Sequence, residues 1–231
     1  MQMPVFERYI DELIEKSTVE IPAWNIEKAK AGKAVGWNYI DGCMILALLE
    51  IYAATGEKKY YDFADAFIDH RVREDGSIAG YSVEEYNLDN INAGKTLFLL
   101  YGLNGKEKYR RAIELIYSQV QNQPRTAEGN FWHKKIYPNQ VWLDGMYMAQ
   151  PFYMEYETKL HDRQNYKDIF GQFANVIRHM RDEKMGLYYH GYDASREIFW
   201  CNKETGLSEN FWLRALGWYS MALLDTLAKC E

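Results

Sequence analysis

The sequence predicts an all-α protein, an (α/α) toroid in which buried inner helices alternate with amphipathic outer helices. Segments that are apolar on every side, as a fully buried helix must be, alternate with segments that carry apolar residues on one helical face. The pair recurs along the chain, which is typical of a repeat architecture. The pairs are too few to close a six-pair ring, so we expect an incomplete (α/α)6 barrel. It would form a single domain over residues 1–231, apparently truncated at the C-terminus.

The first elements follow this scheme. An amphipathic helix is expected from about Pro4 to Ser17, with apolar residues on one face and charged residues on the other. The first inner helix is the run Cys43–Ala54, in which only Glu50 is charged. The outer helix that follows begins near Tyr60 and has a single apolar stripe, so it should cover the inner one.

The same pair then recurs. Leu88–Leu103 and Leu143–Leu160 are the next inner helices, and each is followed by an amphipathic outer helix, beginning near Tyr109 and Tyr166. A fourth inner helix begins near Phe211 and has no outer helix after it. Because its apolar surface would be uncovered, self-association through this helix is expected.

The repeat places acidic residues and long loops together. Asp41, Asp89 and Asp144 each open an inner helix, and the connections from outer to inner helices are the long ones. All long loops therefore lie on one rim, where function is usually carried. Two of them, Asn130–Trp142 and Gly186–Trp200, alternate in a strand-like way and predict short hairpins.

Composition excludes several classes of function. The chain has 231 residues, a net charge of −6 and no basic run, which argues against nucleic-acid binding. No uncharged stretch is long enough to cross a bilayer, so no membrane partner is expected. The three cysteines have no metal-ligand spacing and the N-terminus does not resemble a signal peptide. A cytoplasmic location is expected, or a periplasmic one if a signal peptide was removed. No cofactor or metal motif is present, so neither is expected.

The three aspartates allow two interpretations. Each could cap its inner helix, which stabilises the charged carboxylate. Alternatively, carboxylates that face one cavity repel each other, so that one of them keeps a proton and acts as a general acid. Asp144 has the most apolar neighbours in the sequence, Trp142 and Met146, and is the candidate acid. Asp89 would be its charged neighbour.

Other polar residues on the rim are candidates for substrate binding. His133, Lys134 and His190 lie in the loops, where a solvated side chain is the simpler interpretation. Arg214 lies in an apolar helix and must find an acidic partner. It could form an internal ion pair with Asp144, Asp89 or Glu209, or it could bind a substrate carboxylate.

Aromatic residues make up 16% of the chain, and core packing explains most of such a content. Several of them nevertheless fall near the starts of inner helices. Aromatic rings in such a group can serve as stacking platforms for a sugar. They are Trp37, Tyr39, Trp142, Trp212 and Trp218.

Several motifs in combination resemble glycoside hydrolase family 105, the unsaturated rhamnogalacturonyl hydrolases, which are related to the unsaturated glucuronyl hydrolases. The motifs are VWLDGMYMAQPF, LDN at Leu88–Asn90, FWHKK, YYHGYD and FWLRALGWYSMAL. The resemblance covers the whole chain and about the N-terminal two-thirds of a typical member, and it implies the six-pair α/α-toroid fold. By resemblance, Asp144 is the acid/base and Asp89 the supporting carboxylate. The residues that match the substrate pocket are Tyr39, His133, Trp142, His190, Arg214 and Trp218.

The resemblance implies a hydrolase that acts on unsaturated oligosaccharides from pectin. It would hydrate the C4=C5 bond of a terminal 4,5-unsaturated uronic acid and release the neighbouring sugar, with rhamnose as the expected leaving sugar. Two alternatives stay open: a non-catalytic carbohydrate-binding remnant, and a glucuronyl hydrolase acting on glycosaminoglycan-type disaccharides. A sugar isomerase would need paired histidines on the inner helices, and these helices contain none.

Overall fold

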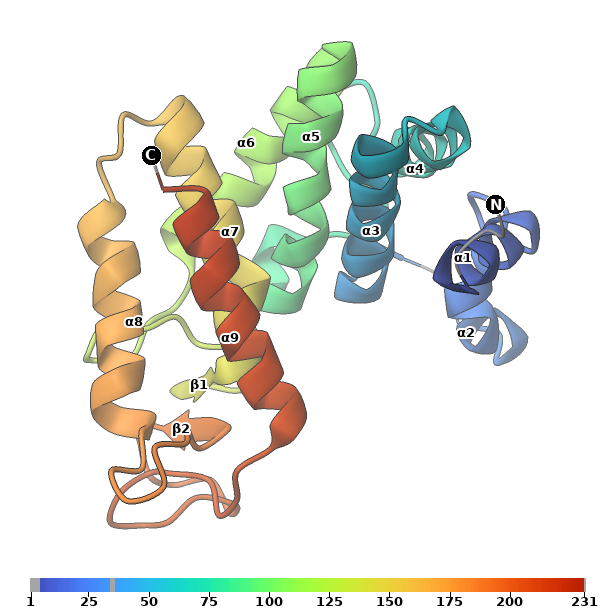
Figure 1. Ribbon diagram of the computed structural model, residues 1–231. Helices are drawn as coiled ribbons and strands as arrows, with labels where there is room; N and C mark the ends of the chain where they lie inside the picture. The colour runs from blue at the N-terminus through green and yellow to red at the C-terminus, as the bar shows by residue number, and fades with distance from the viewer. Residues whose placement is uncertain (1–4, 34–35, 231) are drawn as a thin grey trace. The chain divides into compact units, whose positions relative to one another are not determined.

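The computed structural model describes residues 5–33 and 36–230, which are mostly helical (Figure 1). The chain forms two compact units. Unit 1 comprises Met1–Tyr81 and Ala93–Glu114, and unit 2 comprises Ser82–Asn92 and Leu115–Glu231. The single domain over 1–231 stays a prediction.

Unit 1 is built around helix α3 (Tyr39–Thr55), whose Ile45, Leu48 and Leu49 are buried. Helices α4 and α5 both pack against α3. This arrangement confirms the predicted pair of a buried inner helix and an amphipathic cover. The other helices of the unit are α1 (Val5–Glu15), η1 (Ala23–Asn25), α2 (Ile26–Lys30), α4 (Lys58–Arg71) and α5 (Lys95–Asn104). The predicted start of the first helix at Pro4 lies outside the described residues.

Two elements have residues in both units of the chain. The inner helix predicted over Leu88–Leu103 begins as a 3₁₀ helix, η3 (Leu88–Gly94), and continues as α5. The outer helix α6 (Glu107–Asn122) follows. A further 3₁₀ turn, η2 (Val83–Glu85), precedes η3 in unit 2. Asp89 therefore lies in a tight 3₁₀ turn rather than in an α-helix.

Unit 2 is built around helix α7 (Leu143–Leu160), which is buried over nearly its whole length. Helix α8 (Tyr166–Met180) is amphipathic and turns its apolar face to α7, and α9 (Leu213–Ala228) packs along α7 through small and aromatic residues. Figure 1 shows both helices running beside α7. The predicted inner and outer roles of α7 and α8 are confirmed.

The far side of α9 is exposed within the described chain. Leu213 is 84% exposed, and Leu224 and Leu227 are each 67% exposed. This is the uncovered apolar surface that the sequence predicts for the last inner helix. Self-association through it stays a prediction.

The two short strands of unit 2 correct a prediction. Strand β1 (Gln140–Trp142) pairs antiparallel with β2 (Gly191–Asp193), with Trp142 opposite Gly191. The two loops thus pair with each other through these strands, and within the first loop an antiparallel bridge also joins Lys134 to Tyr137. Val141 and Tyr192, which are opposite each other in the pairing, are both buried. No helix among the described residues is long and apolar enough to cross a membrane.

Candidate active site

The capping interpretation of the aspartates is wrong for two of them. Helix α3 is capped by Asn38, whose side chain accepts hydrogen bonds from the backbone N–H groups of Ile40 and Asp41. Helix α7 follows Trp142 directly, and no side chain caps it. Asn87 accepts from the backbone N–H of Asp89. The aspartate side chains at the starts of α3 and α7 therefore make other interactions.

Asp41 is a structural residue within unit 1. Its carboxylate is 1% exposed and accepts hydrogen bonds from Trp24 Nε1 at 2.8 Å, Asn25 Nδ2 at 2.6 Å and Asn38 Nδ2 at 2.8 Å. Burial raises the pKa of Asp41, although these donors lower it in part. Both oxygens are engaged inside the unit, so neither can reach a substrate.

Asp144 opens onto a cavity of about 350 Å³. Strand β1 runs directly into α7, so Trp142 is extended and Asp144 stands in the first helical turn two residues later. The size is within the range of small-molecule sites. Most of the wall is aromatic, and we call this space the indole cavity. Its lining residues are Trp142, Asp144, His190, Gly191, Trp200 and Trp212.

Arg214 reaches Asp144 from the first turn of α9. Its guanidinium forms an ion pair and hydrogen bond with the Asp144 carboxylate. The guanidinium carbon also lies 3.7 Å from the ring centroid of Trp212, a cation–π contact. Of the three acidic partners that the sequence allows for Arg214, the structure selects Asp144.

His190 is fixed by backbone contacts. Its Nδ1 lies 2.8 Å from the backbone oxygen of Asn210 and 3.1 Å from Ser208 Oγ. A carbonyl oxygen only accepts, so Nδ1 carries the hydrogen, and in the neutral ring Nε2 is then the acceptor. The carbonyl of His190 in turn accepts from the N–H of Leu143 at 3.1 Å, which ties this loop to the start of α7.

Trp200 lies over Gly191. A Cβ atom at Gly191 would be 3.1 Å from Cη2 of Trp200 and 3.4 Å from Cζ3, so a glycine here lets the indole approach the strand. Trp212 is one of the aromatic residues that the sequence predicts as stacking platforms, and the structure places it in the cavity lining. Trp200 is not among the predicted residues, because it comes from a loop and gives no periodic signal.

Asp89 lies in a second cluster, outside the lining of the indole cavity. Lys134 Nζ is 2.7 Å and His133 Nε2 is 3.3 Å from its carboxylate. Burial alone would raise the pKa of Asp89, but His133 and Lys134 together lower it to about 2. Asp89 is therefore a charged carboxylate, as expected of the neighbour of the acid.

Two contacts connect the Asp89 cluster to the indole cavity. The His133 ring stacks on Trp142, with centroids 4.4 Å apart and planes at 14°. In addition, a Cβ at Gly145 would lie 2.8 Å from His133 Nδ1 and 3.0 Å from Leu88 Cδ1. The Asp-Gly pair at Asp144 is thus explained, because any larger residue after the aspartate would displace His133.

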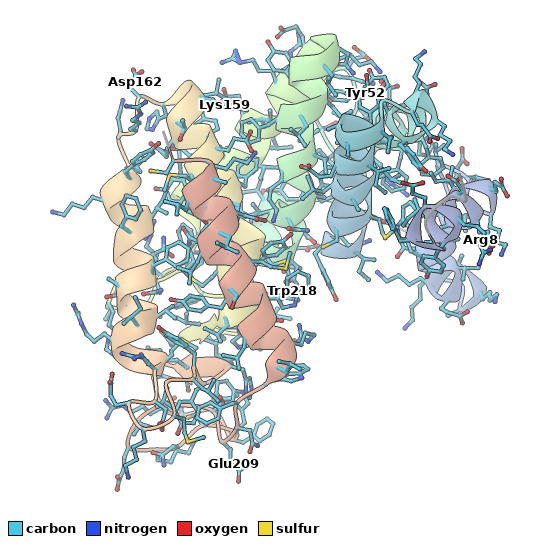
Figure 2. The ribbon with its side chains drawn as sticks, viewed as in Figure 1. Arg8, Tyr52, Lys159, Asp162, Glu209 and Trp218 are labelled. Carbon is cyan, nitrogen blue, oxygen red and sulfur yellow. The ribbon has the colours of Figure 1, made fainter. Side chains whose placement is uncertain are left out.

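The structure brings four of the predicted site residues together and places a further three beside them. Trp142, Asp144, His190 and Arg214 meet at the indole cavity, and the cluster of Asp89, His133 and Lys134 adjoins it through Trp142. Trp218, labelled in Figure 2, packs on Tyr147 of α7 with ring centroids 4.7 Å apart and is not in the cavity lining. Tyr39 opens α3 in unit 1, and its role stays a prediction.

Comparison with known proteins agrees with the resemblance read from the motifs. Residues 9–231 match the sequence family described as Glycosyl Hydrolase Family 88. Protein Atu3128 of Agrobacterium fabrum is 40% identical over 80 residues, which is 35% of this chain and 34% of that protein.

Solved structures match over nearly the whole chain. A family 105 glycoside hydrolase of C. acetobutylicum ATCC 824 is 40% identical with a TM-score of 0.88, over 99% of this chain and 60% of that one. A possible member of that family from Salmonella enterica serovar Paratyphi A is 19% identical with a TM-score of 0.74, over 99% of this chain and 61% of that one. The chain thus spans about three-fifths of these relatives. The likeness confirms the predicted α/α-toroid fold class and the resemblance to family 105.

Proposed function

We propose that this chain, which belongs to Glycosyl Hydrolase Family 88, hydrates the C4=C5 bond of a terminal 4,5-unsaturated uronic acid and thereby releases the neighbouring sugar. The observation that carries the proposal is the indole cavity, in which Asp144 is the single carboxylate among the described lining residues. Ordinary glycoside hydrolysis uses two carboxyl groups that flank the scissile bond. Hydration of a vinyl ether needs one group that both gives and takes a proton.

The reaction assigns both proton transfers to Asp144. Its carboxyl group donates a proton to C4, and the ring oxygen stabilises the positive charge that develops at C5. A water molecule then adds to C5 while the Asp144 carboxylate takes one of its protons, which restores the acid. The resulting hemiketal opens to a ketone at C5 and leaves a hemiacetal at C1, and the hemiacetal expels the neighbouring sugar as an alcohol. One water is consumed in all.

Arg214 would bind the uronate carboxylate of the substrate. A guanidinium fits a carboxylate in two-point geometry, and here it already stands at one, that of Asp144. A bound uronate would compete for Arg214 and draw it away from Asp144. Asp144 would then face the substrate without this counter-ion, among the indole rings that line the cavity.

The Asp89 cluster would set the position of the cavity wall. The Asp89 carboxylate contacts Nε2 of His133, and the His133 ring stacks on Trp142, which lines the cavity. His190 would offer Nε2 to a substrate hydroxyl or to the attacking water.

The substrate we propose is an unsaturated oligosaccharide of pectin origin with rhamnose as the leaving sugar, from the resemblance to family 105. A second candidate is carbohydrate binding without turnover. It is favoured by the ion pair of Asp144 with Arg214, which engages the carboxylate that the reaction would need.

An absorbance assay separates the two candidates. An unsaturated uronyl–rhamnose disaccharide should lose its ultraviolet absorbance with the chain present, and the same disaccharide with a saturated uronate should not be cleaved. An unsaturated disaccharide with a hexosamine leaving group tests the glucuronyl hydrolase alternative. Binding by calorimetry with no loss of absorbance from either unsaturated disaccharide would overturn the proposed activity in favour of the binding candidate.

A further inference from the structure

A second cavity adjoins the indole cavity in unit 2. Its volume is about 500 Å³, and Trp200 lines both cavities, so the indole is a shared wall. Ser208 lines the second cavity and places its Oγ 3.1 Å from Nδ1 of His190, which lines the first. The two spaces are therefore neighbours on one surface.

We propose that this second cavity is a subsite for a neutral sugar on the leaving-group side of the substrate. The inference rests on the proposed function, because it takes the unsaturated uronate to be bound at Asp144. An unsaturated ring is always the terminal unit of its chain, so every further sugar lies on the leaving-group side. A chain of three or more units would then continue from the indole cavity past Trp200 into the second cavity.

The walls of the second cavity offer both types of contact that a sugar ring uses. Trp200 and Tyr189 provide aromatic surface, and the Tyr189 ring is held against Phe211 with centroids 4.6 Å apart. Asn202, also in the lining, is fixed because its Oδ1 accepts from the N–H groups of Glu204 and Thr205, both at 2.9 Å. This leaves the Nδ2 hydrogens as donors on the other side of the amide.

The charge of the second cavity selects a neutral sugar. Glu209, labelled in Figure 2, is the one ionised side chain among the described lining residues. Lys203 is near in sequence, but its ammonium is bound by the backbone oxygens of Glu197 at 2.8 Å and Ile198 at 2.6 Å. A uronate in this cavity would meet the like charge of Glu209, while the Lys203 ammonium is directed to the two carbonyl oxygens and lies outside the described lining. A sugar hydroxyl would instead donate to the Glu209 carboxylate.

Chain-length kinetics test the subsite. We expect the KM of an unsaturated trisaccharide with a neutral third sugar to be about tenfold below that of the matching disaccharide, the effect of one or two net hydrogen bonds. A trisaccharide with a uronate in third place should show no such gain. Glu209→Ala should raise the KM of the neutral trisaccharide about fivefold more than that of the disaccharide, because it removes an acceptor. Glu204→Ala is the matched control, since Glu204 is exposed on the same loop and outside the lining.

A binding measurement keeps this proposal separate from the catalytic one. The neutral disaccharide that corresponds to the leaving group is titrated calorimetrically into the wild-type chain and into Glu209→Ala, with no turnover required. Weaker binding to the variant supports the subsite. Equal KM values for the disaccharide and the neutral trisaccharide, with equal binding to both proteins, would overturn the subsite and leave the hydratase proposal standing. Loss of turnover for every substrate with retained, Glu209-dependent binding would overturn the hydratase proposal alone.

Discussion

Asp41 in unit 1 and Asp144 in unit 2 occupy the same place in the repeat and have opposite surroundings. Each stands in the first turn of a buried helix and is followed by glycine. Asp41 is sealed among the neutral donors Trp24, Asn25 and Asn38, whereas Asp144 opens onto a cavity and faces the cation Arg214. The position in the repeat therefore brings a carboxylate to the start of a helix, and the neighbouring loops decide its role.

The loops differ in where they come from along the chain. The partners of Asp41 all precede it, within the segment that leads into α3. The surroundings of Asp144 come mostly from much later residues, the segment 190–214 that follows α8 and enters α9. Donors from a short preceding segment enclose the Asp41 carboxylate, whereas a long loop that pairs with β1 leaves the Asp144 carboxylate open to the cavity.

The strongest test of this difference is to remove each acid in turn. Asp144→Asn should lower kcat about 10³-fold, within the range for loss of a general acid and base, while the fold is retained. Asp41→Asn should change kcat by less than about threefold, because both oxygens of its buried carboxylate are bound inside unit 1. The measurement is the loss of ultraviolet absorbance of an unsaturated disaccharide, with far-ultraviolet circular dichroism as the check on folding. Normal turnover by Asp144→Asn would remove it as the acid.

The glycine after Asp144 provides a finer test. Gly145→Ala forces a Cβ to within 2.8 Å of His133 Nδ1 and 3.0 Å of Leu88 Cδ1. We expect it to lower stability by about 1–3 kcal/mol, as for other overpacked sites. It should also lower kcat/KM about 10- to 100-fold through displacement of His133 and Trp142.

The matched control for this variant is Gly171→Ala in α8. Nothing lies within 4 Å of a Cβ at Gly171, so alanine should be neutral or stabilise the helix by up to about 1 kcal/mol. Chemical unfolding and the absorbance assay measure both variants. If Gly145→Ala behaved like Gly171→Ala, the contact between His133 and the start of α7 would not matter for the site.

Periodicity predicted the helices and the places of the three aspartates well. Inner helices such as α7 are apolar on every side, and outer helices such as α8 carry a single stripe of apolar residues. The spacing of apolar residues therefore predicts which helix faces are buried. It also placed Trp142 and Arg214 near Asp144, since each lies at the start of an inner helix.

Loop partners could not be predicted in this way. The pairing of β1 with β2 joins segments about 50 residues apart and depends on which residues become buried together. Trp200 reaches the cavity only through this pairing, because it lies on Gly191. Helix capping is one of the two interpretations that the sequence allows for the aspartates, but Asn38 stands at the geometrically correct position before α3 and takes that role.

The electrostatic contrast between the sealed and the paired carboxylates predicts opposite pH dependences of stability. The pKa of Asp89 is lowered from 3.8 to about 2 by His133 and Lys134, against the effect of burial, so its folded state releases the proton more readily than the unfolded state does. The contribution of ionised Asp89 to the free energy of unfolding is complete above about pH 4 and is lost as the pH falls toward 2. Burial raises the pKa of Asp41. The contribution of its protonated form to the free energy of unfolding is therefore complete below about pH 4 and is lost as the pH rises.

Asparagine variants isolate these two contributions because asparagine does not titrate. The free energy of unfolding of the wild type minus that of Asp89→Asn should increase by about 2 kcal/mol between pH 2 and pH 4 and then stay level. The same difference for Asp41→Asn should decrease as the pH rises above about 4, since only the unfolded state then gives up the proton easily. Urea titrations across this pH range measure both slopes. Slopes of the same sign would mean that Arg71, which lowers the pKa of Asp41, outweighs the effect of burial, or that Asp89 has lost its cations, and the contrast between the two units would not hold.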